Sequence, residues 1–187
     1  MKVYRIAHDS NHYQFLLPKR EKDALFFYDF DGTSRAVNWR PPPMTLFTKG
    51  KLQRGDFFQF AQGVVISNSR GVDALNVAFF EPAGELLPLT VGKEMYYVLN
   101  VTRCIDCLDE ETTTREGDDP IVPGSIVQYR FRPQALRAIG LFKIPETART
   151  EVLLVEGIRD RDDEFSAIAE RHALTGLQFE LLWSSQE

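Results

Sequence analysis

Cysteine is nearly absent from this chain of 187 residues, and long apolar runs are missing altogether. The two cysteines, Cys104 and Cys107, are too few for a disulfide framework, so nothing points to an oxidising compartment. No apolar stretch approaches the roughly 18 residues that a membrane helix requires. The first twenty residues carry several charged side chains and lack the apolar centre of a secretory signal. We therefore expect a cytoplasmic protein that does not insert into a membrane.

Familiar catalytic and cofactor motifs are also missing. The sequence contains no Gly-x-Ser-x-Gly elbow, no phosphate-binding loop and no glycine-rich dinucleotide motif. His8 and His12 are four residues apart on an expected turn, so solvated histidines are a simpler interpretation than a metal site. Cys104 and Cys107 lack the second ligand pair of a zinc site and the preceding βαβ unit of a thioredoxin-like pair. We predict no metal, no cofactor and no catalytic residue.

Positive charge is scarce in most of the chain. Residues 1–54 carry ten Lys and Arg against five Asp and Glu, whereas the rest carries twelve against twenty-two, a net charge of −10. A nucleic-acid phosphate track needs clustered cations, so we predict that the chain binds no nucleic acid. The acidic remainder would suit a basic protein partner, because complementary charge steers association. A solvated acidic surface that serves solubility explains the same balance equally well.

The length and the order of the patterns indicate one α+β domain. A chain of 187 residues fits the roughly 100–200 residues of a typical domain. We predict a single domain over 1–187, with a strand-rich part at 1–62 and a mixed part at 63–187. Strands are not in strict βαβ alternation with helices, which favours a mostly antiparallel sheet. Runs of apolar or alternating residues predict the strands at 3–7, 13–17, 63–66, 126–131, 139–144, 152–155 and 177–183, and 24–28 is a further short apolar run. The run that begins at Gly84 predicts two more strands joined by a Gly turn, the second with alternating residues over 95–101.

Two main helices and some short helical turns complete the predicted fold. The first would be capped by Ser67 or Ser69 and run to about residue 80. The second spans 160–173, with His172 on its inner side. A short acidic helix is expected after Asn100, opened by the two cysteines, and a helical turn at 133–138. Residues 109–124 are polar and contain Gly and Pro, which predicts an exposed loop.

One enzymatic alternative rests on the segment Asp29-Phe30-Asp31-Gly32-Thr33. It resembles the first motif of haloacid-dehalogenase-type phosphatases, in which two aspartates act with magnesium on a phosphate group. Residues 64–68 and the carboxylates at 117–119 resemble later motifs of that family. That fold, however, requires a helix soon after the first motif, and here Trp39 and three prolines follow. The simpler interpretation is a hairpin turn, which Asp-Gly strongly favours.

Two acidic clusters are the best candidates for binding a basic surface. Residues 104–119 hold seven carboxylates against one arginine, and residues 156–170 hold six against two. An acidic face is a common device for protein recognition, and it is also the usual composition of a solvated loop or helix. The candidate binding residues are Asp109, Glu110, Glu111, Glu116, Asp118, Asp119, Asp160, Asp162 and Asp163.

Several short motifs, taken in order, resemble those of a bacterial family. They are Val3-Tyr4-Arg5 with Asp9 and Tyr13, Trp39 with Pro41, Gly55-Asp56-Phe57, Val65-Ile66-Ser67 with Val72 and Leu75, Gly84-Glu85-Leu86-Leu87-Pro88-Leu89, Tyr96-Tyr97-Val98-Leu99-Asn100-Val101, Asp106, Leu108-Asp109, and Leu174-Thr175-Gly176-Leu177 with Phe179 and Trp183. The family is that of the immunity proteins of polymorphic and contact-dependent toxin systems, with myxobacterial type members, formerly a domain of unknown function. The resemblance covers nearly the whole chain, while no single motif is specific.

The resemblance implies a protein without enzymatic activity that binds and neutralises a cognate toxin in the producing cell. The toxin would be encoded by an adjacent gene, and a nuclease is a plausible partner. The family's motif residues are expected to be structural: Trp39, Pro88, Asn100, Asp106 and Trp183. Asn100 and Asp106 are expected to bond to the backbone and to fix the turn that follows the strand. The two acidic clusters would then form the toxin-binding surface.

Overall fold

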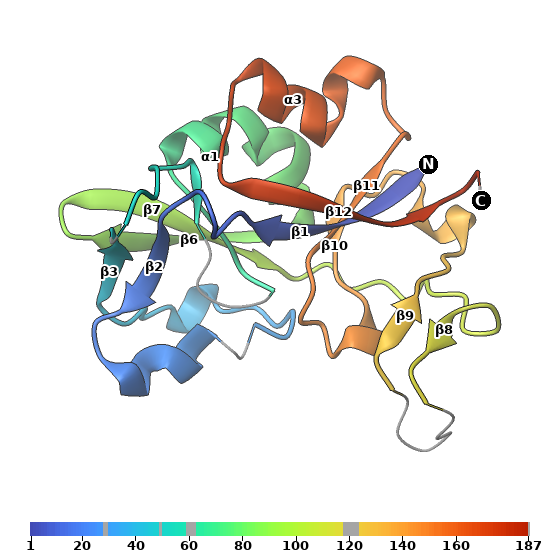
Figure 1. Cartoon of the computed structure of the whole chain (residues 1–187), viewed down its shortest axis with the longest axis horizontal. Helices are drawn as coiled ribbons and strands as arrows, with labels where there is room; N and C mark the ends of the chain where they lie inside the picture. The colour runs from blue at the N-terminus through green and yellow to red at the C-terminus, as the bar shows by residue number, and fades with distance from the viewer. Residues whose placement is uncertain (28–29, 49, 59–62, 118–123, 187) are drawn as a thin grey trace.

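The computed structural model describes residues 1–27, 30–48, 50–58, 63–117 and 124–186, and these form an α+β fold (Figure 1). The named strands pair antiparallel, in two four-stranded sheets and two two-stranded pairs. Two α-helices of seven residues and several short helical turns accompany them. The predicted fold class is confirmed.

The first sheet brings the two ends of the chain together. Its strand order is β10–β11–β1–β12, with β1 at Lys2–His8, β10 at Leu141–Phe142, β11 at Leu153–Glu156 and β12 at Leu177–Ser184. β1 lies between β11 and β12 and so has neighbours on both edges. The two termini lie close together (Figure 1), and the amide of Ser185 donates to the carbonyl of Met1 at 3.0 Å.

The second sheet contains the long hairpin that the sequence predicted. Its order is β4–β5–β7–β6, with β4 at Phe57–Phe58, β5 at Val65–Ser67, β6 at Gly84–Val91 and β7 at Glu94–Val101. The pairing of β6 with β7 is unbroken from Gly84–Val101 to Val91–Glu94. Pro88 lies on the edge strand β6, where a missing backbone donor is tolerated.

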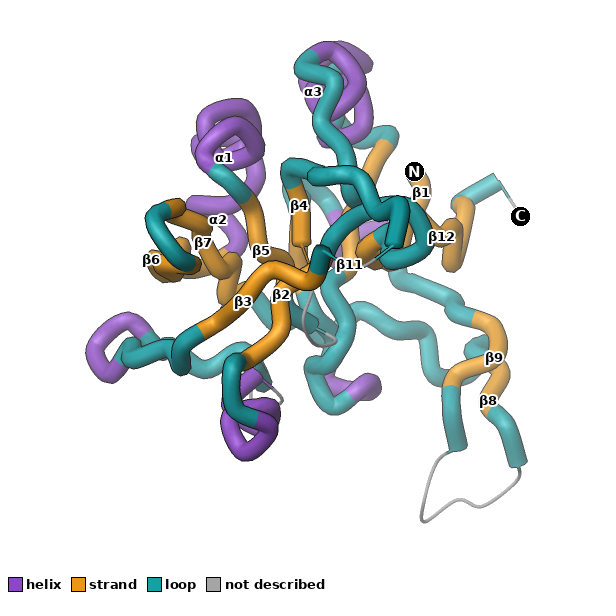
Figure 2. Tube along the Cα trace, turned by 60° about the vertical axis from the view of Figure 1, so that its left-hand side comes forward, coloured by secondary structure: helices purple, strands orange, loops and turns teal. Residues whose placement is uncertain are grey.

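Two shorter pairs extend from the sheets. β2 at Phe15–Pro18 pairs with β3 at Met44–Phe47, and β8 at Thr114–Arg115 pairs with β9 at Ile126–Gln128. β8 and β9 project away from α3, the helix at Phe165–Arg171, in both views (Figures 1 and 2). The apolar run at 24–28 belongs, as far as residue 27, to the 3₁₀-helix η1 at Glu21–Phe27, and η2 follows at Ala36–Asn38.

The first predicted helix is present but is divided into three pieces. α1 at Ser69–Leu75 leads into the π-helical η3 at Asn76–Phe80 and then into α2 at Glu81–Ala83. The cap is Asn68, whose side chain accepts from the amide of Gly71 at 3.1 Å, so the expectation of Ser67 or Ser69 was wrong. Asn68 fits the role because its side-chain oxygen satisfies a free amide of the first turn.

The second predicted helix is shorter than expected. Residues Arg161–Asp163 form the 3₁₀ turn η6, and α3 begins after it and buries Phe165 and Ile168. His172 is exposed, so its predicted place on the inner side was wrong. Short 3₁₀ turns also occur as η4 at Pro133–Leu136, which was predicted, and as η5 at Pro145–Thr147.

No helix follows β7 in the described segment 102–113, so the predicted short acidic helix was wrong. This segment instead runs alongside other parts of the chain. Cys104 forms an isolated bridge with Lys143, and Leu108 forms one with Phe131. These bonds use backbone groups that a helix would have paired internally.

Three groups of buried side chains form the core. One joins the two sheets to the helices and includes Phe57, Phe79 and Phe165. A second lies between the second sheet and the β2–β3 pair. The third lies on the first sheet, where Trp183 contacts Phe131 at 5.8 Å between ring centroids. This third group includes Ile105, Cys107 and Leu108, and so anchors the start of the first acidic cluster.

Candidate functional site

The first acidic cluster lies on a well-anchored surface segment, residues 104–116, called here the acidic segment. Its backbone is tied to the chain around β9 and β10: the amide of Ile105 donates to Lys143 at 2.9 Å, and that of Asp109 donates to Arg130 at 2.8 Å. The carbonyl of Cys107 in turn accepts from Arg132 at 2.8 Å. These bonds fix the backbone path of residues 105–109.

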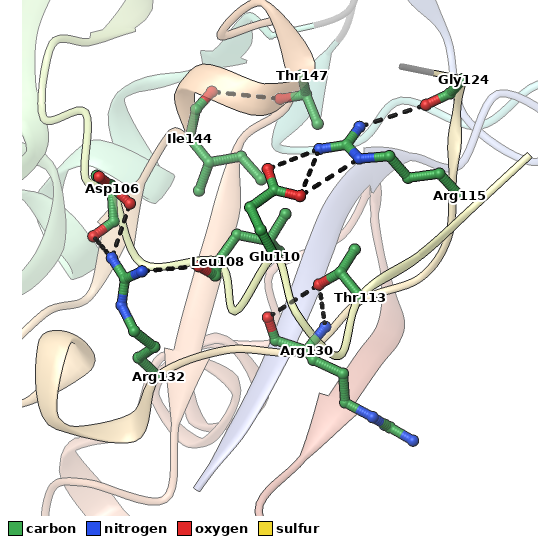
Figure 3. Close-up of polar contacts among 10 residues, drawn as sticks. All are labelled: Asp106, Leu108, Glu110, Thr113, Arg115, Gly124, Arg130, Arg132, Ile144 and Thr147. Atoms are coloured by element: carbon green, nitrogen blue, oxygen red, sulfur yellow. Dashed lines mark hydrogen bonds and ion pairs between the residues drawn. The ribbon is translucent and has the colours of Figure 1, made fainter. Parts of the chain in front are cut away.

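Arginines neutralise part of this segment (Figure 3). Arg115 binds both carboxylate oxygens of Glu110 through Nη2, at 2.8 and 3.1 Å. Arg132 Nη2 binds Asp106 Oδ1 at 2.7 Å and also the backbone oxygen of Asp106. Glu111 and Glu116 are exposed. The other carboxylate of this part, Asp109, is half-buried, and the candidates Asp118 and Asp119 lie outside the described residues.

The second acidic cluster has a different position and a mixed role. Asp160, Asp162 and Asp163 are exposed around η6. Glu164, which follows them, is buried, and its Oε1 accepts from the three consecutive amides of residues 157, 158 and 159, each at 2.9 Å. Glu164 is therefore structural, because one carboxylate oxygen satisfies three backbone donors of the same turn.

The structure does not bring the two acidic clusters together. The β8–β9 pair that continues the acidic segment and the helix α3 that follows η6 lie on different sides of the molecule in both views (Figures 1 and 2). A single compact surface containing all the candidate residues is therefore absent from the described part of the chain.

The expected structural residues have well-defined contacts. Trp39 Nε1 donates to the carbonyl of Pro88 at 2.6 Å, which ties the loop after η2 to the edge of the second sheet. Asn100 is fully buried and its Nδ2 donates to the backbone oxygen of Thr33 at 2.9 Å, so its expected bond to backbone is confirmed. Asn100 does not fix the turn after its own strand, because Thr33 belongs to a distant loop.

Asp106 differs from its expected role. Its side chain is 75% exposed and pairs with the guanidinium of Arg132 rather than with a backbone group. The expectation of a side-chain to backbone bond at this position was wrong, since the arginine supplies a stronger charge-assisted partner.

The residues of the phosphatase alternative are arranged as follows. Asp29 lies outside the described residues. Asp31 is exposed and its Oδ1 accepts from the amide and the hydroxyl of Thr33, which lowers the pKa of Asp31. Asp31 and Gly32 lie between η1 and η2 rather than between two paired strands, so the interpretation as a hairpin turn was wrong.

The cysteines and histidines form no metal-ligating group among the described residues, which contain no cluster of three or more His, Cys, Asp or Glu suited to an ion. Both cysteines are free thiols. Burial, followed by the nearby carboxylate of Glu146, raises the pKa of Cys107 to about 12. His12 Nδ1 lies 2.8 Å from Asp9 Oδ2 on the exposed turn where a solvated histidine was expected. His8 is instead buried at the end of β1, so the expectation of a solvated turn histidine at this position was wrong.

A pocket that the sequence did not indicate lies beside the acidic segment. Its volume is about 600 Å³, and its walls include Arg5, Arg115, Tyr129, Glu146 and Glu151. These residues come from β1, β8, the end of β9, η5 and the loop before β11. Residues this far apart in sequence form no local pattern, so only the fold could place them together.

None of the helices in the described residues is long and apolar enough to span a membrane.

Comparison with known proteins gave no matching family model and no matching curated protein.

Proposed function

We propose that this protein is an immunity protein that binds a basic bacterial toxin in the cytoplasm of the producing cell and blocks it. The observation that carries the proposal is the acidic segment, a surface segment with an anchored backbone and exposed carboxylates in an acidic protein of net charge −5. The ordered motifs that resemble polymorphic-toxin immunity proteins support the same function.

The mechanism would be steric occlusion directed by charge. Glu111 precedes β8 and Glu116 follows it, and both side chains are exposed, so a partner can approach them without rearrangement of the core. Unpaired surface carboxylates of this kind accelerate association with a basic partner and favour it over acidic competitors. Apolar contacts around them would supply most of the affinity, as is usual at protein interfaces.

Co-expression with the toxin encoded by the neighbouring gene tests the proposal. We expect cells that carry both genes to survive and the two proteins to purify as a complex. The double variant Glu111→Lys with Glu116→Lys should slow association by about tenfold, with a weaker dependence on salt. The double variant Glu21→Lys with Glu81→Lys, two exposed reversals on η1 and α2, is the matched control and should change little. Equal toxicity with and without this protein, together with no complex, would contradict the proposal.

A further inference from the structure

The strand β12, red in Figure 1, is a long uncovered edge of the first sheet. β1 pairs with one side of β12, and among the described residues no backbone hydrogen bond reaches residues 178–183 from the other side. Residues 178–181 are all exposed. An edge of this kind presents a row of backbone donors and acceptors with which another strand can pair.

The other edges of the two four-stranded sheets are protected against such pairing. β10 and β4 have two residues each. β6 is long, but Pro88 lacks a backbone donor, and the indole of Trp39 donates to the carbonyl of Pro88 and occupies that edge. Short strands, prolines and covering groups are the usual devices that prevent edge pairing. Residues 177–181 of β12 contain no proline and no lysine, so this edge lacks these devices.

Glu180 is the single charged residue at 177–181, and its side chain is held over the sheet. Its Oε2 accepts from Nη1 of Arg5 on β1 at 2.6 Å, which draws the carboxylate away from the free edge. The neighbours of Glu180 along the strand are apolar: Phe179 is 36% exposed and Leu181 is 48% exposed. The free edge therefore combines backbone groups with apolar side chains, and its one charge already has a partner within the chain.

A β-bulge sets the length of the free edge. Leu181 pairs with Tyr4, but Trp183 pairs with Val3, so Leu182 is an extra residue in β12. A bulge bends the strand and increases its twist, which ends regular pairing at that point. The part of β12 that can receive a straight partner strand is therefore residues 177–181, and its centre is residue 179.

We propose that this edge pairs antiparallel with the β12 edge of a second copy of this chain, so that the first sheets of the two copies form one continuous sheet. Full overlap of residues 177–181 with themselves places the two-fold axis at Phe179. Phe179 then lies opposite the partner's Phe179, Leu177 lies opposite the partner's Leu181, and Gln178 lies opposite the partner's Glu180. The inference is independent of the toxin.

This register is favoured because every opposed pair is compatible. The apolar side chains meet one another, and the Gln178 amide can donate to Oε1 of the partner's Glu180, the oxygen that Arg5 does not use. An axis at Glu180 would place two carboxylates opposite each other, which is destabilising. An axis at Gln178 would place Leu181 opposite the partner's Thr175 and lose its apolar contact.

The pairing of Gln178 with Glu180 gives a test in solution. Sedimentation velocity up to about 100 μM should show a monomer–dimer equilibrium for the wild type, since a small interface gives a weak dimer. Gln178→Glu should raise the dissociation constant about fivefold, because it opposes two carboxylates, and Gln178→Lys should lower it by a similar factor. Gln128→Lys, the same exchange at an exposed residue of β9, is the matched control for net charge and should change little.

Two outcomes of this measurement would overturn the proposal. One is a wild type that remains monomeric over the whole concentration range. The other is a dimer that Gln178→Lys weakens as much as Gln178→Glu does, because Gln178 would then not lie opposite a carboxylate. An effect of Gln128→Lys as large as that of Gln178→Lys would also count against it, since the net charge alone would then explain the change.

Single cysteines locate the axis directly. Phe179→Cys should form a disulfide-linked dimer under mild oxidation, because directly opposed residues lie about 4.5–5.5 Å apart between Cα atoms, within the range that a disulfide spans. Leu181→Cys is the control, since this position would lie about 13 Å from its own copy. The wild type, with the free thiols of Cys104 and Cys107, gives the background. A linked dimer of Leu181→Cys, or no linked dimer of Phe179→Cys above that background, would overturn the proposed register.

Discussion

Replacing Lys143 by methionine should abolish a specific pH dependence of the protein's stability. Lys143 is fully buried next to β10, and its Nζ donates to the backbone oxygen of Phe30. Burial lowers the pKa of its ammonium group from 10.5 to about 8, although the charge of Asp31 partly opposes this. Methionine fills a similar volume with an unbranched apolar chain that carries no charge.

The magnitude follows from the two pKa values. The pKa of Lys143 differs by about 2.5 units between the unfolded and the folded state, which corresponds to about 3 kcal/mol. Below pH 8 the lysine is protonated in both states, and the free energy of unfolding is lower by this amount than it would be with a neutral lysine. Between pH 8 and pH 10.5 the unfolded chain keeps the proton and the folded protein releases it, so stability rises with pH. Between pH 7 and pH 9.5 the gain from this group is about 2 kcal/mol.

Urea unfolding of wild type and Lys143→Met at these two pH values measures the effect. The free energy of unfolding of the wild type should rise by about 2 kcal/mol relative to the variant. Other titrating groups affect both proteins alike and cancel in the difference. Folding raises the pKa values of Tyr96 and Tyr129 from 10.0 to about 12, so these groups reduce the free energy of unfolding as the pH rises above 10. The measurement therefore stops at pH 9.5, below that range.

The reasoning has a clear contrary outcome. A wild-type minus variant difference that is the same at pH 7 and pH 9.5 would show that Lys143 keeps its proton throughout this range. A difference that moves in favour of the variant at pH 9.5 would show that the folded state raises the lysine pKa rather than lowering it. The lost hydrogen bond to Phe30 shifts both values equally and does not affect the test.

Three further outcomes are expected. Asp56→Ala should lower the free energy of unfolding by about 3 kcal/mol in urea titrations, because this buried carboxylate accepts four hydrogen bonds that join α1 to the loop before β12. Gly176→Ala should cost about 2 to 4 kcal/mol by the same measurement, since its φ is 103° and a Cβ atom would lie 2.5 Å from the Phe57 carbonyl oxygen. Cys107 should react with iodoacetamide at pH 8 far more slowly in the folded protein than in urea, as followed by mass spectrometry, because burial raises its pKa to about 12; equal rates would contradict its buried state.

Short sequence patterns predicted the elements whose hydrogen-bond partners lie nearby in the sequence. The β6–β7 hairpin was predicted because residues 95–101 alternate and a glycine turn precedes them; the structure has this glycine at residue 92, with a φ of 65°. β1 and β12 were predicted as separate strands, but their pairing joins opposite ends of the chain and leaves no periodic signal. Long loops are closed at only a small extra entropic cost, so the sequence between two strands does not show whether they pair.

The predicted acidic helix after Asn100 failed because tertiary bonds outweighed local preference. The amides of Ile105 and Asp109 are taken by carbonyls of residues 143 and 130, so they are unavailable for a helical ladder. Helix propensity contributes less than 1 kcal/mol per residue for ordinary residues and is routinely overridden in this way. The same distance in sequence explains why the pocket around Glu146 was not predicted.

The separation of the two acidic clusters limits what one partner can contact. On the proposed function, a toxin that covers the acidic segment lies on the β8–β9 side, whereas Asp160, Asp162 and Asp163 lie at η6, before α3. At physiological salt the Debye length is about 8 Å, so carboxylates on another side of the molecule add little to the contact energy. These carboxylates would instead add to the overall negative electrostatic field, which speeds the encounter with a basic partner. On the proposed function, the β8–β9 side, where Glu111 and Glu116 are exposed, is therefore the surface on which affinity for a basic partner would be concentrated.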